Sequence, residues 1–300
     1  MASSLNRPVK IIGAALSLGQ TKYGVNYTPH LLKTEKIKQL SEPYAVWGDI
    51  VEESVYRPEE PRINKVRNLK EIGQYNRALY SSILKNTKPE EFLLTIGGNH
   101  SIASSTVSAL LSIHKSNLGV IWVDAHGDCN TPDTSITGNY HGMPLAHVLG
   151  LFRDPQHLNW GQLELDLGSV AMIGLRDIDP KEKELMDSIG LVYFTMDQVK
   201  SQGIQTIMQK ALKHVDPDNS KMMHLSLDVD GLDPSIFPGT GTKVPDGISL
   251  EQYKVIADSL KNCGQRFCSM DLVELNFGLE KKITMQSTIE VLRMTLPKNS

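Results

Sequence analysis

Histidine and aspartate side chains follow three short apolar stretches of the sequence. These residues are His100, Asp124, His126, Asp128, Asp228 and Asp230. In an extended chain, alternate side chains share one face. Asp124, His126 and Asp128 can therefore meet at one point, and so can Asp228 and Asp230. An isolated Asp-x-His or Asp-x-Asp segment is commonly a turn or a cap, but these segments together predict a metal centre.

The charge of these six side chains favours a pair of divalent cations. Four carboxylates packed together repel one another unless cations lie among them, and the two imidazoles are neutral when they bind metal. Two divalent ions balance the charge of the four aspartates. An oxygen-rich site with two imidazoles and no thiolate suits Mn²⁺ or a similar ion. A pair of such ions can generate hydroxide near neutral pH.

The elements that position these residues are predicted from short runs rich in Ile, Val and Leu. Eight runs predict β-strands: Val9–Leu16, Ala45–Ile50, Phe92–Gly97, Gly119–Asp124, Ser169–Leu175, Val192–Met196, Met222–Asp228 and Phe267–Val273. Their composition is typical of strands buried on both faces. Helical patterns lie between them, so strand–helix alternation implies one mostly parallel sheet with helices on both faces. Ligands bind beyond the carboxyl ends of the strands in such folds.

Three helices have clear sequence signals. Apolar residues three or four positions apart predict one helix, with the stripe Leu69, Ile72, Tyr75, Leu79 and Ile83. A second helix is predicted from the N-cap Ser249 to just before Gly264, with the stripe Tyr253, Ile256 and Leu260. Pro180 predicts the start of a third helix, with Glu182 and Glu184 in its first turn.

The composition argues against several classes of partner and location. The net charge is −3 and the pI is about 6.3, so we expect no nucleic-acid or anionic-membrane partner. No apolar stretch approaches the roughly 20 residues that span a bilayer. The three cysteines, Cys129, Cys263 and Cys268, indicate a reducing, cytoplasmic location. The N-terminus is basic and acid-poor, but about seven residues before the first strand are too few for a targeting segment.

Three motifs contain the candidate metal ligands: Gly97-Gly98-Asn99-His100-Ser101, Asp124-Ala125-His126-Gly127-Asp128 and Ser226-Leu227-Asp228-Val229-Asp230. From Ile11 to Glu274 the sequence resembles the ureohydrolase family, which includes arginases, agmatinases, guanidinobutyrases and formiminoglutamases. The resemblance implies one α/β catalytic domain over residues 1–300, with three α/β/α layers and a mostly parallel eight-stranded sheet. It also implies two Mn²⁺ ions per subunit. One is bound by His100, Asp124, Asp128 and Asp228, and the other by Asp124, His126, Asp228 and Asp230.

The loop after the second motif distinguishes between members of this family. Residues 130–144 resemble the loop of arginases rather than that of agmatinases. In arginases this loop binds the substrate α-carboxylate, and the matching residues are Asn130, Ser135 and Thr137, with Asn139 close by. Neutral amide and hydroxyl donors can bind a carboxylate without a buried cation. In most loops, however, Ser, Thr, Asn and Gly serve only to form turns and bind no ligand.

Further substrate contacts follow from the same resemblance. Asp179 matches the residue that meets the substrate α-amine, helped by Glu182. Thr242 and Glu274 match positions near the guanidinium, where a carboxylate can pair with the planar cation. His141 matches a mobile proton shuttle, and an imidazole titrates in the required pH range.

The resemblance to arginases implies manganese-dependent hydrolysis of L-arginine to L-ornithine and urea. As a hypothesis, a metal-bridging hydroxide attacks the guanidinium carbon, Asp128 passes a proton to the leaving amine, and His141 relays a proton. Activity should then rise toward alkaline pH. The implied partner is this small-molecule substrate, and the implied assembly is a homo-oligomer, a trimer or a multiple of it.

Three alternatives and several departures from the family pattern accompany this hypothesis. An agmatinase or other guanidino-acid hydrolase needs no carboxylate contact, so the loop argues against it. A catalytically silent member with a regulatory role is disfavoured by the six intact ligands and His141. A fold relative that acts on acyl-lysine would use a single zinc ion. The departures are Asn99, Gly127, Cys129, Thr137 and Lys243.

Overall fold

The structure is a computed structural model that describes residues 7–35, 45–53 and 61–297. The expectation that too few residues precede the first strand for a targeting segment involves residues 1–6, which lie outside the described residues. Among the described residues, no helix combines the length and the apolar character that crossing a bilayer requires.

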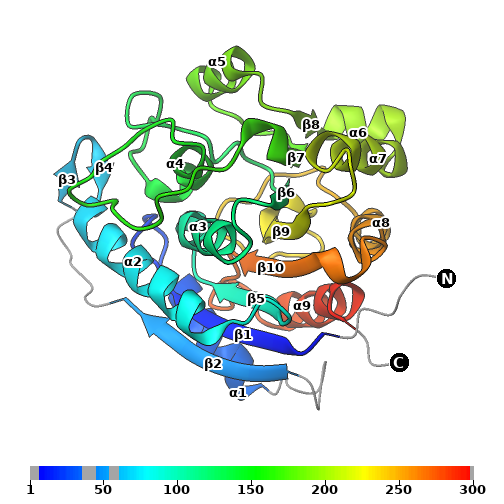
Figure 1. The fold of residues 1–300 in the computed structure, drawn as a ribbon, viewed down its shortest axis with the longest axis horizontal. Helices are drawn as coiled ribbons and strands as arrows, with labels where there is room; N and C mark the ends of the chain where they lie inside the picture. The colour runs from blue at the N-terminus through cyan, green and yellow to red at the C-terminus, as the bar shows by residue number, and fades with distance from the viewer. Residues whose placement is uncertain (1–6, 36–44, 54–60, 298–300) are drawn as a thin grey trace.

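Eight strands form one sheet in which all neighbouring strands are parallel (Figure 1). Each predicted strand segment overlaps one of them, so the predicted parallel sheet is confirmed. In spatial order the strands are β2 (Ala45–Glu52), β1 (Val9–Ala15), β5 (Phe92–Gly97), β10 (Phe267–Val273), β9 (Met222–Asp228), β6 (Leu118–Val123), β7 (Val170–Leu175) and β8 (Tyr193–Thr195).

The prediction that all eight strands are buried on both faces is wrong for β2 and β8. Every residue of β5, β6, β7 and β10 is buried, whereas no residue of β2 or β8 is fully buried. These two strands form the edges of the sheet, so each has a neighbouring strand on one side only. A separate hairpin of β3 (Arg62–Ile63) and β4 (Val66–Arg67) was not predicted, because two-residue strands have no measurable periodicity.

Helices cover both faces of the sheet and form two apolar cores. One core contains side chains of α2 (Leu69–Asn86), α3 (Ala103–Ile113), α4 (Pro144–Val148) and α5 (Pro180–Ile189). The other contains side chains of α1 (Thr28–Thr34), α6 (Met196–Gln202), α7 (Ile204–Val215), α8 (Leu250–Lys261) and α9 (Lys282–Thr295). Alternate residues of a central strand enter opposite cores, so that Trp122 of β6 packs in the first and Val123 in the second. The predicted α/β/α layering is confirmed.

The three helices with sequence signals begin and end close to the predicted residues. The stripe along α2 is buried from Leu69 to Ile83. Helix α8 begins after Ser249, which forms a capping box with Gln252. It ends at Lys261, and Gly264 then begins a short 3₁₀ turn. Helix α5 begins at Pro180.

Candidate metal centre and active site

The four central strands of the sheet are β5, β10, β9 and β6. The candidate metal ligands lie at or after the ends of three of them, β5, β6 and β9. His100 opens a 3₁₀ turn after β5, and Asp124 follows β6 directly. Asp228 ends β9, and Asp230 lies in the 3₁₀ turn Val229–Gly231 that follows. Because parallel strands end at the same edge of a sheet, the structure brings these side chains together, as expected from the sequence.

One group of side chains surrounds His100. Its Nδ1 lies 3.0 Å from Asp124 Oδ2, 2.9 Å from Asp128 Oδ2 and 3.4 Å from Asp228 Oδ2. Asp128 reaches this position through a left-handed backbone conformation, with φ +47°. All four side chains are buried. This is the set of residues that the sequence predicts for one ion.

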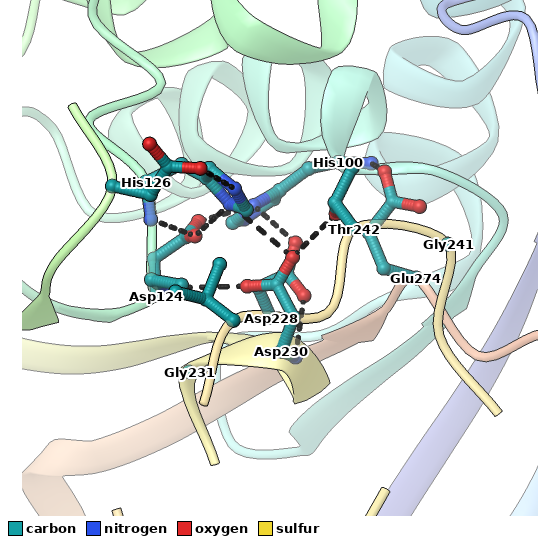
Figure 2. Close-up of polar contacts among 12 residues, drawn as sticks. His100, Asp124, His126, Asp228, Asp230, Gly231, Gly241, Thr242 and Glu274 are labelled. Carbon is teal, nitrogen blue, oxygen red and sulfur yellow. Dashed lines mark hydrogen bonds and ion pairs between the residues drawn. The ribbon is translucent and has the colours of Figure 1, made fainter. Parts of the chain in front are cut away.

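A second group surrounds His126 and shares Asp124 with the first. His126 Nδ1 lies 3.4 Å from Asp124 Oδ1 and 3.2 Å from Asp230 Oδ2. Figure 2 shows both imidazoles facing the carboxylates of Asp124, Asp228 and Asp230. The ligand atoms of His100, Asp124 and Asp128 lie within 4.8 Å of one another, and so do those of Asp124, His126 and Asp230, so each set of three could hold a metal ion.

Hydrogen bonds and packing fix the orientation of the ligands. Asp124 Oδ1 accepts a bond from the backbone N–H of His126 (2.8 Å), and Asp228 Oδ1 accepts one from that of Asp230 (2.9 Å). The His100 ring stacks on Trp122 at 4.4 Å, and Trp122 Nε1 donates to Asp124 Oδ2. Partners of this kind hold metal ligands in one rotamer and tautomer.

Burial and mutual repulsion act against ionised carboxylates in this cluster. Burial and the charge of Asp124 raise the pKa of Asp128 to about 6. Burial and the charges of Asp230 and Asp124 raise the pKa of Asp228 well above its usual range. Burial acts to lower the pKa of His100, but its hydrogen bonds to carboxylates outweigh burial and raise it. Positive charge among these side chains would therefore stabilise the ionised carboxylates, and the oxygen and imidazole donors suit divalent cations.

A cavity of about 260 Å³ opens above these ligands. Its lining includes His126, Asp128, Asp228 and Asp230 at the base, and His141. The lining also contains all but one of the predicted substrate contacts: Asn130, Ser135, Thr137, Asn139, Asp179, Glu182 and Thr242. The remaining one is Glu274, which does not line the cavity.

Two hydroxyls of the loop are arranged as donors toward the cavity. Ser135 Oγ accepts a bond from the backbone N–H of Gly138 (3.0 Å), and Thr137 Oγ1 accepts one from that of Asn139 (3.1 Å). Each hydroxyl thus uses an acceptor position in the turn and keeps its own hydrogen to donate. Turn chemistry and the capacity to bind a carboxylate therefore coexist in this loop.

Glu274 connects His141 with the backbone of the metal centre. Its carboxylate accepts bonds from the backbone N–H of His100 (3.0 Å) and from Gln20 Nε2 (2.6 Å), and lies 3.1 Å from His141 Nδ1. Burial acts to lower the pKa of His141, but the hydrogen bond and charge of Glu274 outweigh burial and raise it. The pair therefore favours a protonated His141 beside an ionised Glu274.

Comparison with known proteins assigns this site to a family. The family model described as Arginase family matches residues 7–296. The chain belongs to the arginase family. An arginase of Plasmodium berghei (strain Anka) is 34% identical over 296 residues, which cover 91% of this chain and 83% of that protein. It follows that this protein is a hydrolase of the arginase type.

Solved arginase structures share the whole fold. The native arginase of Bacillus caldovelox gives a TM-score of 0.89 at 31% identity, over 98% of this chain and 99% of that chain. An Entamoeba histolytica arginase in complex with L-ornithine gives a TM-score of 0.87 at 30% identity, over 95% of this chain and 97% of that chain. Both similarities cover nearly the whole of this chain.

Two departures from the family pattern now have a physical explanation. A Cβ atom at Gly127 would lie 2.6 Å from Cδ of Glu182, so a larger residue here would displace the buried Glu182 carboxyl. Glu182 Oε1 also accepts a bond from the backbone N–H of Cys129 (2.8 Å). Cys129 is fully buried, as expected, and burial raises the pKa of its thiol, so it is no reactive thiolate. Nothing in the structure explains Lys243.

Several residues of this arginase-family site were not predicted. Gln20, Thr21 and Lys22 line the cavity after β1, and Asp177 lines it after β7. The rule that ligands bind beyond the carboxyl ends of parallel strands pointed to both segments. Ser226, whose Oγ lies 2.8 Å from His100 Nε2, was also missed, although it shares a strand face with Asp228.

Proposed function

We propose that this protein hydrolyses L-arginine to L-ornithine and urea with two Mn²⁺ ions. The observation that carries the proposal is the pair of adjoining donor groups around His100 and His126, which share the buried Asp124. The solved Entamoeba histolytica relative is described in complex with L-ornithine. The same product is proposed for this chain.

The residues that would hold the ions are those of the two groups, with Asp228 as a shared ligand that the resemblance to arginases implies. His100, Asp124, Asp128 and Asp228 would bind one, and Asp124, His126, Asp228 and Asp230 the other. The four aspartates balance two divalent cations, and carboxylate and imidazole donors without thiolate suit Mn²⁺. Such a pair of ions supplies Lewis acidity and lowers the pKa of water.

The wall of the cavity would bind the amino-acid end of the substrate. Asn130, Ser135, Thr137 and Asn139 would donate hydrogen bonds to the α-carboxylate, since the hydroxyls keep their hydrogens free. Asp179 lies on the same wall, and its Oδ2 is 3.4 Å from Asn130 Nδ2. We propose that Asp179, with Glu182 beside it, binds the α-amine.

Proton transfer would depend on Asp128 and His141. Asp128 lies at the base of the cavity, where it would take a proton from the attacking water and pass it to the leaving amine. His141, held by Glu274, would relay a proton between the cavity and solvent. Thr242 Oγ1 donates to Asp230 Oδ2 (2.7 Å), so Thr242 would lie beside the reacting guanidinium. Glu274 would interact with the guanidinium through His141.

The proposal extends to the assembly and the compartment. The resemblance to arginases supports a homotrimer or a multiple of it, with a complete site in each subunit. The described free cysteines, two of them buried, support a cytoplasmic location.

The experiment is an assay of purified protein with L-arginine after Mn²⁺ loading and after chelation. Urea and ornithine should form in equal amounts with Mn²⁺, and both should cease after chelation and return on reloading. Product formation that survives complete metal removal would contradict the proposal. A protein with two bound ions and no urea would indicate a catalytically silent member.

A further inference from the structure

Arg176 directly follows β7 and uses its guanidinium to join three backbone segments. Six hydrogen bonds are described for this group, and all six end on carbonyl oxygens. Nε donates to Pro245 (3.0 Å), and Nη1 donates to Gly174 (3.0 Å) and Gly231 (3.2 Å). Nη2 donates to the carbonyls of Asp230 (2.6 Å), Val244 (2.8 Å) and Leu232 (3.4 Å).

The segments that Arg176 joins all border the metal centre. Asp230–Leu232 overlaps the 3₁₀ turn Val229–Gly231, which carries Asp230, and Val244–Pro245 follows Thr242 in the chain. The backbone N–H of Arg176 donates to the carbonyl of Ala125 (2.9 Å), next to Asp124. Arg176, which does not line the cavity, therefore contacts the ends of β6, β7 and β9 and the loop after Thr242.

A Cβ atom at either of two nearby glycines would meet atoms of this region at less than 3 Å. A Cβ atom at Gly231 would lie 2.9 Å from the backbone nitrogen of Asp124. A Cβ atom at Gly247 would lie 2.7 Å from Arg176 Nη2. Arginine has five N–H donors in a planar fork, whereas lysine has three on one flexible ammonium. Lysine at this position would keep the charge, but its three donors on one atom could not make all the bonds that the guanidinium makes.

The site that Arg176 supports includes a bond across the cavity floor. Thr242 Oγ1 donates to Asp230 Oδ2 (2.7 Å), and Figure 2 shows Thr242 facing this carboxylate. Arg176 contacts the carbonyl of Asp230 on one side of this bond and the segment after Thr242 on the other. We propose that Arg176 is a positioning residue that fixes Asp230 for the ion beside His126 and holds Thr242 against it. This inference rests on the proposed metal site.

The test compares Arg176→Lys with Lys200→Met as a matched control. Lys200 Nζ lies 3.3 Å from Asp246 Oδ2, so it is a second cation that contacts the same loop, and among the described residues no hydrogen bond or ion pair joins it to the turn Val229–Gly231. Bound Mn²⁺ per chain is measured by equilibrium dialysis over a range of metal concentrations. Wild type and Lys200→Met should bind two ions. Arg176→Lys should retain one ion, with the affinity of the other reduced about 10- to 100-fold.

A second variant, at Thr242, tests the role of the bond to Asp230 without changing Arg176. Thr242→Val removes the bond to Asp230 and should weaken the same ion. In the double variant with Arg176→Lys, the loss should be smaller than the product of the two separate losses, because both act through Asp230.

The outcomes separate this inference from the proposed function. Wild-type affinity for both ions in Arg176→Lys would overturn the role of Arg176 and leave the proposed function intact. Fully multiplicative losses in the double variant would also overturn it. A wild-type chain that does not bind two ions would overturn both.

Discussion

His100 shows how residues behind a ligand define a metal site. Its Nδ1 faces three carboxylates, while Nε2 lies 2.8 Å from Ser226 Oγ and the ring stacks on Trp122. All these side chains are buried, so the ring has no solvent to replace a lost partner. The tautomer and the direction of Nδ1 therefore depend on the serine.

We predict that Ser226→Ala lowers the affinity for one Mn²⁺ ion about 10- to 100-fold. The ion affected should be the one that His100 binds. Ser269→Ala is the matched control, because Ser269 is equally buried on the neighbouring strand but bonds to His224 rather than to His100. Metal titration checks the prediction, and equal affinities in the two variants would contradict it.

Glu182 should make stability depend on pH. Burial raises the pKa of this carboxyl from 4.5 to about 8. Between these pH values the folded chain binds more protons than the unfolded chain, so the wild-type free energy of unfolding falls as pH rises. We predict that Glu182→Gln lacks this fall and gains stability over wild type by at most ~1.4 kcal/mol per pH unit.

Denaturant unfolding of both proteins at saturating Mn²⁺, from pH 5 to pH 8, measures this difference. The exposed Glu184→Gln on the same helix controls for the loss of a carboxyl group. If the free energy of unfolding changed with pH equally in wild type and in Glu182→Gln, the buried carboxyl would have no raised pKa.

At the residue scale, the sequence predicted those site residues whose types are unusual at strand ends. His100, Asp124 and Asp230 are polar residues in apolar surroundings, so their positions stood out. Gln20 and Ser226 did not, because an amide or a hydroxyl at these positions is unremarkable without its three-dimensional partner. Arg176 acts through backbone carbonyls, which have no signature in the sequence.

At the element scale, helix α8 tests how far local signals determine helix ends. The Ser249 side chain accepts a bond from the backbone N–H of Gln252, and the Gln252 side chain accepts one from the backbone N–H of Ser249. We predict that Ser249→Ala lowers the free energy of unfolding by about 1 kcal/mol and leaves metal binding unchanged. Ser259→Ala, within the same helix, should cost less because it caps no helix end. Equal losses of stability in denaturant would contradict the capping role.

The strands were predictable in number and place because each is a separate apolar run. Their burial was not, since the order of strands in a parallel sheet is set by contacts distant in sequence. The sequences of β2 and β8 therefore resemble those of central strands, although both strands lie at the edges of the sheet. The strand β8 is also shorter than predicted, because Thr195 caps α6, and Met196 belongs to that helix.

At the scale of the whole molecule, the metal centre should contribute to stability. The ligands come from segments around His100, Asp124 and Asp228, the last of which lies more than a hundred residues after the other two, so bound ions connect the central strands. A ligand that binds only the folded state at 1,000 times its Kd adds about 4 kcal/mol. We predict that chelation lowers the melting temperature and that Mn²⁺ restores it, as measured by calorimetry. Identical melting curves with and without Mn²⁺ would contradict this prediction.

The alternation of strands and helices predicted the sheet, and the arginase resemblance predicted a single catalytic domain over residues 1–300. The sheet is confirmed, while the single domain and the trimer stay predictions. The sequence alone could not place Glu274 behind His141 and outside the cavity lining, because that position depends on packing between β10, β5 and the turn that carries His141.

The substrate preference of the Mn²⁺-loaded protein tests the central claim most directly. L-Arginine and agmatine differ in the α-carboxylate, which the loop from Asn130 to Asn139 is proposed to bind. Charge-assisted hydrogen bonds are worth roughly 1.5–3 kcal/mol each, so kcat/KM for urea release should favour L-arginine by at least about 100-fold. A kcat/KM for agmatine that equals or exceeds the value for L-arginine would contradict the proposed function.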